Sequence, residues 1–361
     1  MKYVDEYRDK ALVGKLTGQL RQMNGRRFTF MEVCGGHTHA IHRFGLPSLI
    51  PENFRLISGP GCPVCVTGKS FIDKAVFYAG REKSTIATFG DLLRVPGTSS
   101  SLEKEKSAGA DIRVVFSSMD AVEMARRESS RTIIFLAIGF ETTAPGTALA
   151  VREATRLGLT NFFILCGHKI MPPAMEAIVK EGVAIDGFIC PGHVSAITGS
   201  GIYDFLARDY GMACVVTGFE PVDLTQALYM LARQVMEGRP CVEIQYRRAV
   251  SREGNLLARK AMEEVFETSD SWWRGLGMIP SSGLVLNSRY SSLDIEKHFP
   301  AAIGENESDK GCICGEILRG LKMPPDCRLF RKMCSPENPV GACMVSPEGA
   351  CQTYYHYSHD D

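Results

Sequence analysis

Residues 132–145 read Thr-Ile-Ile-Phe-Leu-Ala-Ile-Gly-Phe-Glu-Thr-Thr-Ala-Pro, and this stretch indicates the fold class. The apolar, β-branched run 132–138 is typical of a buried strand of a parallel sheet. Thr142, Thr143 and Pro145 are typical of a helix start, where threonine caps the first turn and proline is tolerated. A buried strand that leads through a short turn into a helix is the repeating unit of an α/β protein.

Seven further runs of this kind occur along the chain, and helical stretches fit between most of them. The eight runs are 28–33, 54–57, 85–89, 112–116, 132–138, 162–165, 187–189 and 213–216. Strands that alternate with helices predict parallel sheets covered on both faces. The runs form two sets of four, each of which ends in a capped helix start, at Asp120 and Asp223. A duplicated α/β unit is therefore our hypothesis.

With 361 residues, the chain is long enough for two or three domains with cores of their own. We expect five parts along the sequence. They are an N-terminal helix (1–24), a first α/β domain (25–120), a second α/β domain (121–240), a helical connector (241–311) and a small cysteine-rich domain (312–361).

The composition narrows the class of function. The net charge is zero, so nothing indicates a nucleic-acid partner. The first residues contain no apolar signal-peptide core, and no run reaches the roughly 18 apolar residues of a membrane span. We therefore expect a cytoplasmic protein without membrane contact. In that reducing compartment the thirteen cysteines are expected to be metal ligands and reactive thiols rather than a disulfide framework.

Six of the cysteines lie within residues 312–351, among several prolines. They are Cys312, Cys314, Cys327, Cys334, Cys343 and Cys351. Such a stretch has too few apolar residues to fold by burial alone, so a metal or disulfides must stabilise it. The spacing of Cys312, Cys327, Cys334 and Cys351 supplies four thiolates for an iron–sulfur cluster. A structural zinc site is the alternative, although zinc sites more often use tight Cys-x2-Cys pairs, which are absent from this block.

Cys34-Gly-Gly-His37-Thr-His39 follows the first strand run. A thiolate beside imidazoles suits a transition metal such as iron or zinc. These ligands are too few to complete a coordination shell, so the motif predicts an open site shared with a substrate or a partner. The alternative is a buried cysteine in a turn, with histidines on the surface.

Cys62-Pro-Val-Cys65 follows the second strand run and is expected to open a helix. In that position a helix N-terminus lowers a thiol pKa, and the second cysteine closes a disulfide, so redox chemistry is the favoured interpretation. Half of a zinc site is the alternative. Glu141 stands at the mouth of the strand 132–138, where a partly buried acid manages protons or orients a histidine. His168 and His193 have similar positions, but such histidines are more often structural.

Several motifs, in the same order, resemble the HypD family of hydrogenase maturation factors. They are residues 31–46, 59–67, 139–145, 166–169, 191–195, 341–355 and the spacing Cys-x14-Cys-x6-Cys-x16-Cys. The resemblance covers nearly the whole chain. One departure is Gly68, where members of the family often have proline, and it removes no ligand.

The resemblance implies two related α/β domains plus a cluster domain, and a role in assembling the Fe(CN)2CO moiety of NiFe-hydrogenase. Iron would be held between Cys34 and a cysteine of a HypC-type chaperone. A HypE-type partner would deliver cyanide as a thiocyanate. Cys62 and Cys65, together with a 4Fe–4S cluster on the four spaced cysteines, would supply electrons from an external donor.

Within this hypothesis, His37 and His39 are the expected proton-handling residues at the iron, with Glu141 behind them. Cys314 and Cys343 are the alternatives for a place among the cluster ligands. The main hypothesis is a redox-active assembly scaffold that works only with partners. A stand-alone iron–sulfur disulfide reductase that uses Cys62 and Cys65 is the second, and a zinc-stabilised interaction module without redox chemistry is the third.

Overall fold

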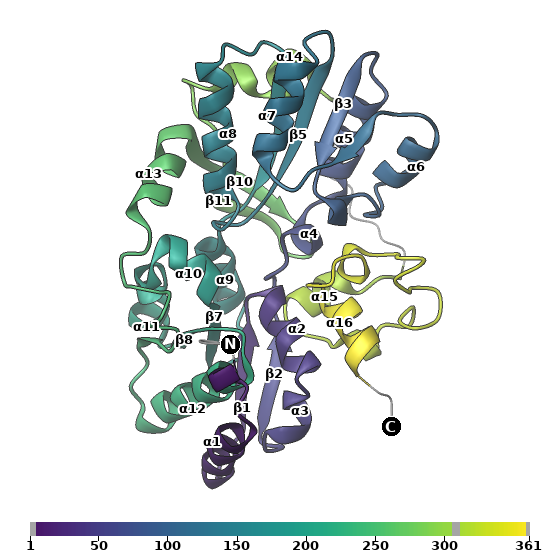
Figure 1. Ribbon diagram of the computed structural model, residues 1–361. Coiled ribbons are helices and arrows are strands. Elements are labelled where there is room, and N and C mark those ends of the chain that lie inside the picture. The colour runs from purple at the N-terminus through teal and green to yellow at the C-terminus, as the bar shows by residue number, and fades with distance from the viewer. Residues whose placement is uncertain (1–4, 305–310, 359–361) are drawn as a thin grey trace.

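The computed structural model describes residues 5–304 and 311–358 (Figure 1). Eleven strands in this part of the chain form two parallel sheets and one antiparallel hairpin. Sheet A has the order β2-β1-β7-β8-β9 and sheet B the order β4-β3-β5-β6. The strands are β1 (Phe28–Glu32), β2 (Phe54–Ser58), β3 (Ser84–Thr88), β4 (Ile112–Val114), β5 (Thr132–Gly139), β6 (Phe162–His168), β7 (Gly187–Pro191), β8 (Ala213–Thr217), β9 (Val242–Ile244), β10 (Phe266–Trp273) and β11 (Gly277–Leu286).

Helices cover the sheets and connect their strands. The α-helices are α1 (Lys10–Gln22), α2 (Gly35–Arg43), α3 (Leu46–Leu49), α4 (Pro63–Val66), α5 (Lys69–Ala79), α6 (Leu102–Ser107), α7 (Ser118–Arg127), α8 (Ala144–Arg156), α9 (Met171–Lys180), α10 (Gly192–Thr198), α11 (Asp204–Tyr210), α12 (Pro221–Glu237), α13 (Leu256–Val265), α14 (Ile295–His298), α15 (Cys314–Leu318) and α16 (Ala350–Tyr357). The short 3-10 helices are η1 (Asp5–Tyr7), η2 (Gly90–Leu92), η3 (Ser200–Tyr203), η4 (Ser291–Leu293), η5 (Pro324–Asp326) and η6 (Ala342–Met344). Among the described residues, no helix has both the length and the hydrophobicity needed to cross a membrane.

The structure confirms the α/β class with parallel sheets, and each of the eight predicted runs overlaps a strand. The strand pairing, however, does not follow two consecutive sets of four. The chain leaves sheet A after β2, builds the whole of sheet B with β3 to β6, and returns to sheet A with β7. The expected boundary at residue 120 falls within α7, between two strands of sheet B. Local strand and helix signals do not state which strands pair, because pairing depends on long-range contacts.

The expectation of a helical connector at 241–311 does not hold for residues 266–286, which form the antiparallel hairpin β10–β11. α13 is helical as expected, β9 falls in the run 242–246 that the sequence set apart from the helices, and residues 305–310 lie outside the described part of the chain. The Trp273 side chain, fully buried, lies at the end of β10 and stacks on Phe140 with ring centroids 5.8 Å apart. Its Nε1 donates a hydrogen bond of 2.8 Å to Ser282 Oγ on β11, so burial and a hydrogen bond together stabilise the hairpin.

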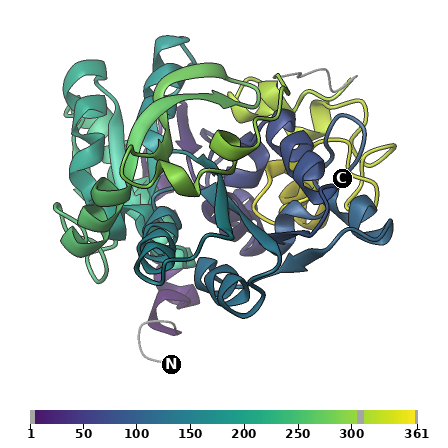
Figure 2. The ribbon, with the colours of Figure 1, turned by 90° about the horizontal axis from the view of Figure 1, so that it is seen from above.

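The described part of the cysteine-rich segment, residues 311–358, is built from short helices and turns. Its helix α16 packs on α2, which follows β1 of sheet A. Its helix η6 packs on α4, which lies where the chain leaves sheet A to build sheet B. Figure 1 shows this segment in yellow beside α2 and α4, and Figure 2 shows it from above at one side of the molecule. The segment therefore lies against the carboxyl ends of β1 and β2, where α2 and α4 begin.

A buried ion pair ties the start of α12 to the loop after β9. The Asp223 carboxylate, whose side chain is 0% exposed, accepts hydrogen bonds of 2.8 and 2.5 Å from the Arg248 guanidinium. That guanidinium lies 3.7 Å from the ring centroid of Tyr7 and 4.2 Å from that of Tyr246. Gln245 Nε2 donates a further hydrogen bond of 2.9 Å to Asp223. A buried charge is tolerated only with such partners, so this network should stabilise the fold.

We predict that Asp223→Ala lowers the free energy of unfolding by about 3–5 kcal/mol, because it leaves a largely buried guanidinium without its carboxylate. Urea denaturation measures the change. Glu123→Ala is the matched control, since its ion pairs with Arg126 and Arg127 lie on the surface of α7 and should contribute little. Equal stability of the two variants would contradict a stabilising role for the buried pair.

Candidate thiol and metal site

Cys34 lies where β1 ends and α2 begins, as the N-cap residue of α2. The open site predicted from the motif implies an exposed thiol, but Cys34 is only 2% exposed. Two glycines let other chain segments reach it. A Cβ atom on Gly61 would lie 2.1 Å from the Cys34 backbone nitrogen, and one on Gly35 would lie 2.3 Å from the carbonyl oxygen of Glu348. Only glycine fits at these contacts, so the loops after β1 and β2 and the cysteine-rich segment meet around Cys34.

His193 is the imidazole that contacts the Cys34 thiol. Its Nδ1 and Nε2 atoms lie 3.9 and 4.0 Å from Cys34 Sγ. His37 is fully buried nearby, and its Nε2 lies 3.1 Å from the carbonyl oxygen of Gly218. Both rings pack on Phe219, with centroid distances of 5.1 Å for His193 and 4.6 Å for His37. His193 was expected at the carboxyl end of a strand, with a structural role. Its contact with Cys34 follows from the pairing of β1 with β7, which no local motif predicts.

His39 and Glu141 have other neighbours. The His39 ring packs edge-on against Tyr357 at 5.3 Å. Glu141 accepts a hydrogen bond of 2.9 Å from the backbone N–H of Met171, so it connects the end of β5 to the start of α9. Burial raises the pKa of Glu141 to about 7. The described contacts therefore bring His37 and His193 towards Cys34, whereas the hydrogen bond of Glu141 is to the start of α9.

Burial controls the charge at the Cys34 site. It raises the pKa of the Cys34 thiol, and the negative charge of Glu348 raises it further, although the N–H groups of Gly36 and His37 act in the opposite direction. Burial lowers the pKa of His37 to about 3 and that of His193 to about 4. At neutral pH the thiol is protonated and the imidazoles are neutral. Metal binding there must therefore release the thiol proton.

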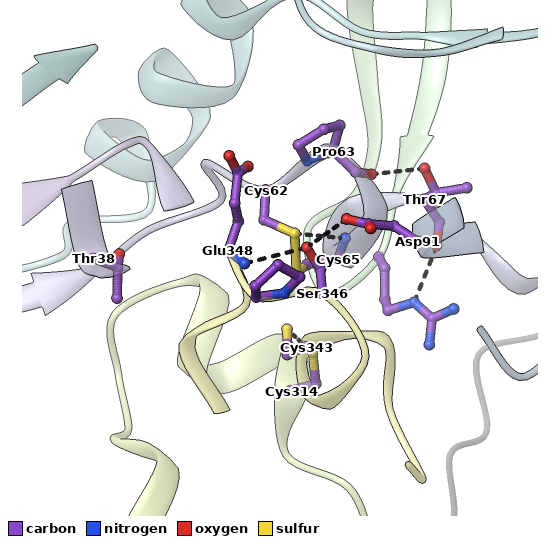
Figure 3. Close-up of a disulfide and its surroundings, with 12 residues drawn as sticks. Thr38, Cys62, Pro63, Cys65, Thr67, Asp91, Cys314, Cys343, Ser346 and Glu348 are labelled. Carbon is purple, nitrogen blue, oxygen red and sulfur yellow. Dashed lines mark hydrogen bonds between the residues drawn. A yellow bond between two sulfur atoms is a disulfide. The ribbon is translucent and has the colours of Figure 1, made fainter. Parts of the chain in front are cut away.

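Three polar residues to which the sequence predictions gave no role, Asp91, Ser346 and Glu348, lie in the same region, as Figure 3 shows. Ser346 Oγ donates a hydrogen bond of 3.3 Å to Asp91 on η2, and the backbone N–H of Glu348 donates one of 3.3 Å to Ser346 Oγ. Burial, and then the charge of Asp91, raises the pKa of Glu348. These contacts join sheet B, through Asp91, to the cysteine-rich segment beside Cys34. Ser346 and Glu348 lie within the motif 341–355, and Asp91 follows the strand run 85–89.

Cys62 and Cys65 form a disulfide at the start of α4. The backbone N–H of Cys65 donates a hydrogen bond of 3.1 Å to Cys62 Sγ. Both residues are buried, at 3% and 0% exposure. The backbone N–H of Gly35 donates a hydrogen bond of 3.0 Å to the carbonyl oxygen of Gly61, which links the Cys34 loop to this disulfide loop. The two thiol motifs are therefore neighbours in space.

Cys314 and Cys343 form a second thiol pair that the sequence did not indicate. Their Sγ atoms are 2.8 Å apart, and both residues are buried. Cys343 belongs to η6, which packs on α4, and Figure 3 shows the pair on the cysteine-rich side of the Cys62–Cys65 disulfide. All four cysteines belong to one buried cluster of side chains. Both thiol pairs are therefore buried at the contact between α4 and η6.

All six cysteines of the segment line one small cavity. Its other walls include Ile317, Leu329, Phe330 and Met344. In the ranges 5–304 and 311–358, no three His, Cys, Asp or Glu side chains converge closely enough to hold a single metal ion. The sulfur atoms surround an apolar space instead, which suits a cluster, because each cysteine then binds a different iron atom. The donor set fits an iron–sulfur cluster, and the presence of one remains a prediction.

The fold and these contacts define a cysteine-rich α/β protein in which a buried thiol, a disulfide and a thiol-lined cavity adjoin. The family described as "HypD: Hydrogenase formation hypA family" matches residues 10–358. Two similar proteins are hydrogenase maturation factor HypD2 of Bradyrhizobium diazoefficiens, 47% identical over 99% of this chain and 97% of the relative, and hydrogenase maturation factor HypD of Rhizobium leguminosarum bv. viciae, 48% identical over 99% and 96%. The chain belongs to the HypD family of hydrogenase maturation factors, which confirms the resemblance seen in its motifs.

Six buried groups make the stability depend on pH in two opposite ways. Burial lowers the pKa of four histidines from 6.5, to about 3 for His37 and about 4 for His42, His168 and His193. Below pH 6.5 these histidines take up protons in the unfolded chain but stay neutral in the folded protein, so the free energy of unfolding falls on acidification. Burial raises the pKa of Glu32 to about 8 and that of Glu141 to about 7, from 4.5. Their contribution is present in acid and is lost as the pH rises through the folded pKa.

We predict that the free energy of unfolding is highest near pH 6.5. Below this pH the four histidines outweigh the two carboxyls. As the pH rises past 6.5 the unfolded histidines lose their protons, and each carboxyl then lowers the stability by up to about 1.4 kcal/mol per pH unit, Glu141 until about pH 7 and Glu32 until about pH 8. Urea denaturation between pH 5 and 8 gives the profile, and Glu32→Gln should flatten its alkaline side. A stability that keeps rising from pH 6.5 to 8 would show that these carboxyls do not dominate.

Proposed function

We propose that this protein is a scaffold and redox component for assembly of the Fe(CN)2CO moiety of NiFe-hydrogenase. One observation supports the proposal above the others: Cys34, the Cys62–Cys65 disulfide and the six-cysteine cavity adjoin where the cysteine-rich segment meets sheet A. The family membership supports the link to a hydrogenase, because the relatives carry the name hydrogenase maturation factor.

Iron is the cargo in this proposal, and Cys34 is its ligand. The thiol of Cys34 and the imidazole of His193 are soft and intermediate donors that suit iron. They leave the coordination shell incomplete, so a second protein must contribute a ligand. We assign that ligand to a cysteine of a HypC-type chaperone. Burial of Cys34 supports a partner-dependent site, since the neutral thiol has little affinity for iron until a complex forms.

Cyanide release from a thiocyanate needs two electrons, and a dithiol supplies both. We propose that reduced Cys62 and Cys65 act on the thiocyanate of a HypE-type partner. The carrier S–C bond breaks and the S–S bond between Cys62 and Cys65 forms. One thiol proton goes to the carrier sulfur, the other goes to solvent, and cyanide leaves as an anion for the iron. Atoms and electrons balance without another reactant.

The disulfide must then be reduced again with electrons from an external donor. The Cys314–Cys343 pair is suited to this step, because a dithiol there reduces Cys62–Cys65 by exchange and becomes a disulfide itself. A 4Fe–4S cluster held by Cys312, Cys327, Cys334 and Cys351 supplies single electrons when bound. Free thiols in this number need a reducing compartment, so we assign the protein to the cytoplasm.

A stand-alone disulfide reductase is less consistent with the structure. Cys65 is 0% exposed and Cys62 is 3% exposed, so a substrate disulfide on another protein has no direct approach to them. Thiol exchange requires in-line access to sulfur. A thiocyanate group is slimmer than a protein disulfide and needs a smaller opening to reach these sulfur atoms.

We predict that Cys327→Ser loses iron, sulfide and brown absorbance after anaerobic purification, because it removes one of four cluster ligands. Cys343→Ser should retain all three, since its sulfur pairs with Cys314. Metal and sulfide analysis, together with the visible spectrum, measures the cluster content of both variants. Full cluster content in Cys327→Ser would contradict the ligand set, and bound zinc without iron would favour the zinc-stabilised module.

We predict that Cys34→Ser, purified with the chaperone, lacks the infrared bands of cyanide and carbonyl but retains the cluster. His193→Ala should weaken these bands several-fold, because His193 contacts Cys34 Sγ, and His39→Ala is its matched control on α2. Normal bands in Cys34→Ser would contradict iron binding there. A larger loss in His39→Ala than in His193→Ala would return the role at the iron to His39.

A further inference from the structure

The turn between β10 and β11 contacts the disulfide loop on one side. The backbone N–H of Arg274 donates a hydrogen bond of 2.8 Å to the carbonyl oxygen of Val66. Its side-chain Nε donates one of 3.1 Å to the carbonyl oxygen of Thr67. Arg274 is 5% exposed, so these bonds are made in a buried environment where they are strong. Val66 and Thr67 directly follow Cys65, so the turn holds the end of the disulfide helix.

The same turn contacts the second thiol pair on its other side. Gly275 lies against Gly315, the residue after Cys314. A Cβ atom on Gly275 would lie 2.3 Å from Gly315 Cα, and a Cβ atom on Gly315 would lie 2.8 Å from Gly275 Cα. Real Cβ atoms do not approach other atoms so closely, so two backbones touch here without side chains between them. The distance between the turn and Cys314 is thereby fixed.

The base of the turn is anchored in the core. Trp273 is 0% exposed, stacks on Phe140 and donates a hydrogen bond to Ser282. Lys169 Nζ lies 5.3 Å from the Trp273 ring centroid and donates a hydrogen bond of 2.7 Å to Ser271 Oγ. An anchored turn of this kind sets the position of whatever it contacts, because packed cores resist deformation.

We propose that the β10–β11 turn is the positioning element that holds the Cys62–Cys65 disulfide in place for exchange with Cys314 and Cys343, through the contacts of Arg274 and Gly275. This inference rests on the proposed function, in which the second pair reduces the first. In the exchange, the dithiol of Cys314 and Cys343 becomes a disulfide and the Cys62–Cys65 disulfide becomes a dithiol. The two electrons and two protons pass between the pairs, so no other reactant is needed.

The chain contains a matched pair of glycines for a test. Gly275 and Gly277 both have a positive φ, 81° and 78°, so alanine strains the backbone at either position. Only Gly275 has a neighbour: nothing lies within 4 Å of a Cβ atom on Gly277. Gly275→Ala therefore moves the turn away from Cys314, and Gly277→Ala applies comparable strain without that displacement.

The experiment uses the full chain with its cluster, purified anaerobically with the Cys62–Cys65 disulfide intact. Excess dithionite is added, samples are alkylated at intervals, and mass spectrometry follows the appearance of free Cys62 and Cys65. Cys343→Ser gives the rate of direct reduction by dithionite. We expect Gly277→Ala to stay within about twofold of the wild type and Gly275→Ala to be slower by about tenfold or more, since a displacement of about 1 Å can cost 10² in rate.

Thermal unfolding and cluster content of each variant separate a positioning effect from loss of fold, because a variant that stays folded at the assay temperature and keeps its cluster can be slowed only through the position of the turn. Gly315→Ala approaches the same contact from the other side without a positive φ, and it decides the question if Gly275→Ala does not fold. Wild-type rates in Gly275→Ala and Gly315→Ala would overturn the proposal, as would equal slowing by Gly275→Ala and Gly277→Ala. A wild type no faster than Cys343→Ser would refute the exchange itself, and with it that part of the proposed function.

Discussion

The close approach of three backbone segments around Cys34 is the constraint on which the rest of the site depends. Gly61 lies against the backbone of Cys34, and Gly35 against that of Glu348, with distances that leave no room for a side chain. These contacts bring the ends of β1 and β2 and the cysteine-rich segment together at one edge of sheet A. Parallel strands collect such loops at their carboxyl ends, which explains why an α/β fold suits a site with several thiols.

The elements could be predicted from the sequence, but not the way they pair. Runs such as 132–138 are apolar throughout, so their burial as strands is a local property. Strand β10 reads Phe-Glu-Thr-Ser-Asp-Ser-Trp-Trp, with its most buried residues only at its two ends, and the hairpin was missed for that reason. The insertion of sheet B into sheet A depends on contacts between residues far apart in the chain, which no local pattern encodes.

The site likewise has parts that local motifs predict and parts that depend on long-range contacts. Cys34, Cys62 and Cys65 stand in compact motifs, and the sequence identified them. Cys314 and Cys343 are separated by 29 positions, so their contact follows only from the folding of the whole cysteine-rich segment. Burial is the second property that the motifs did not reveal. It leaves a neutral thiol beside neutral imidazoles.

The interruption of sheet A also restricts the order in which the protein can fold. Strand β1 pairs with β7 through Phe30 and Gly187, and the residues between them include the whole of sheet B. During synthesis on the ribosome, all strands of sheet B are made before β7, whereas β1 cannot pair with β7 until β7 has been made. The loop that contains Cys34 thus acquires its enclosure late, after His193 and then Glu348 have left the exit tunnel. Newly made chains pass through a stage in which this thiol is open to solvent and to other thiols, before the finished protein encloses it.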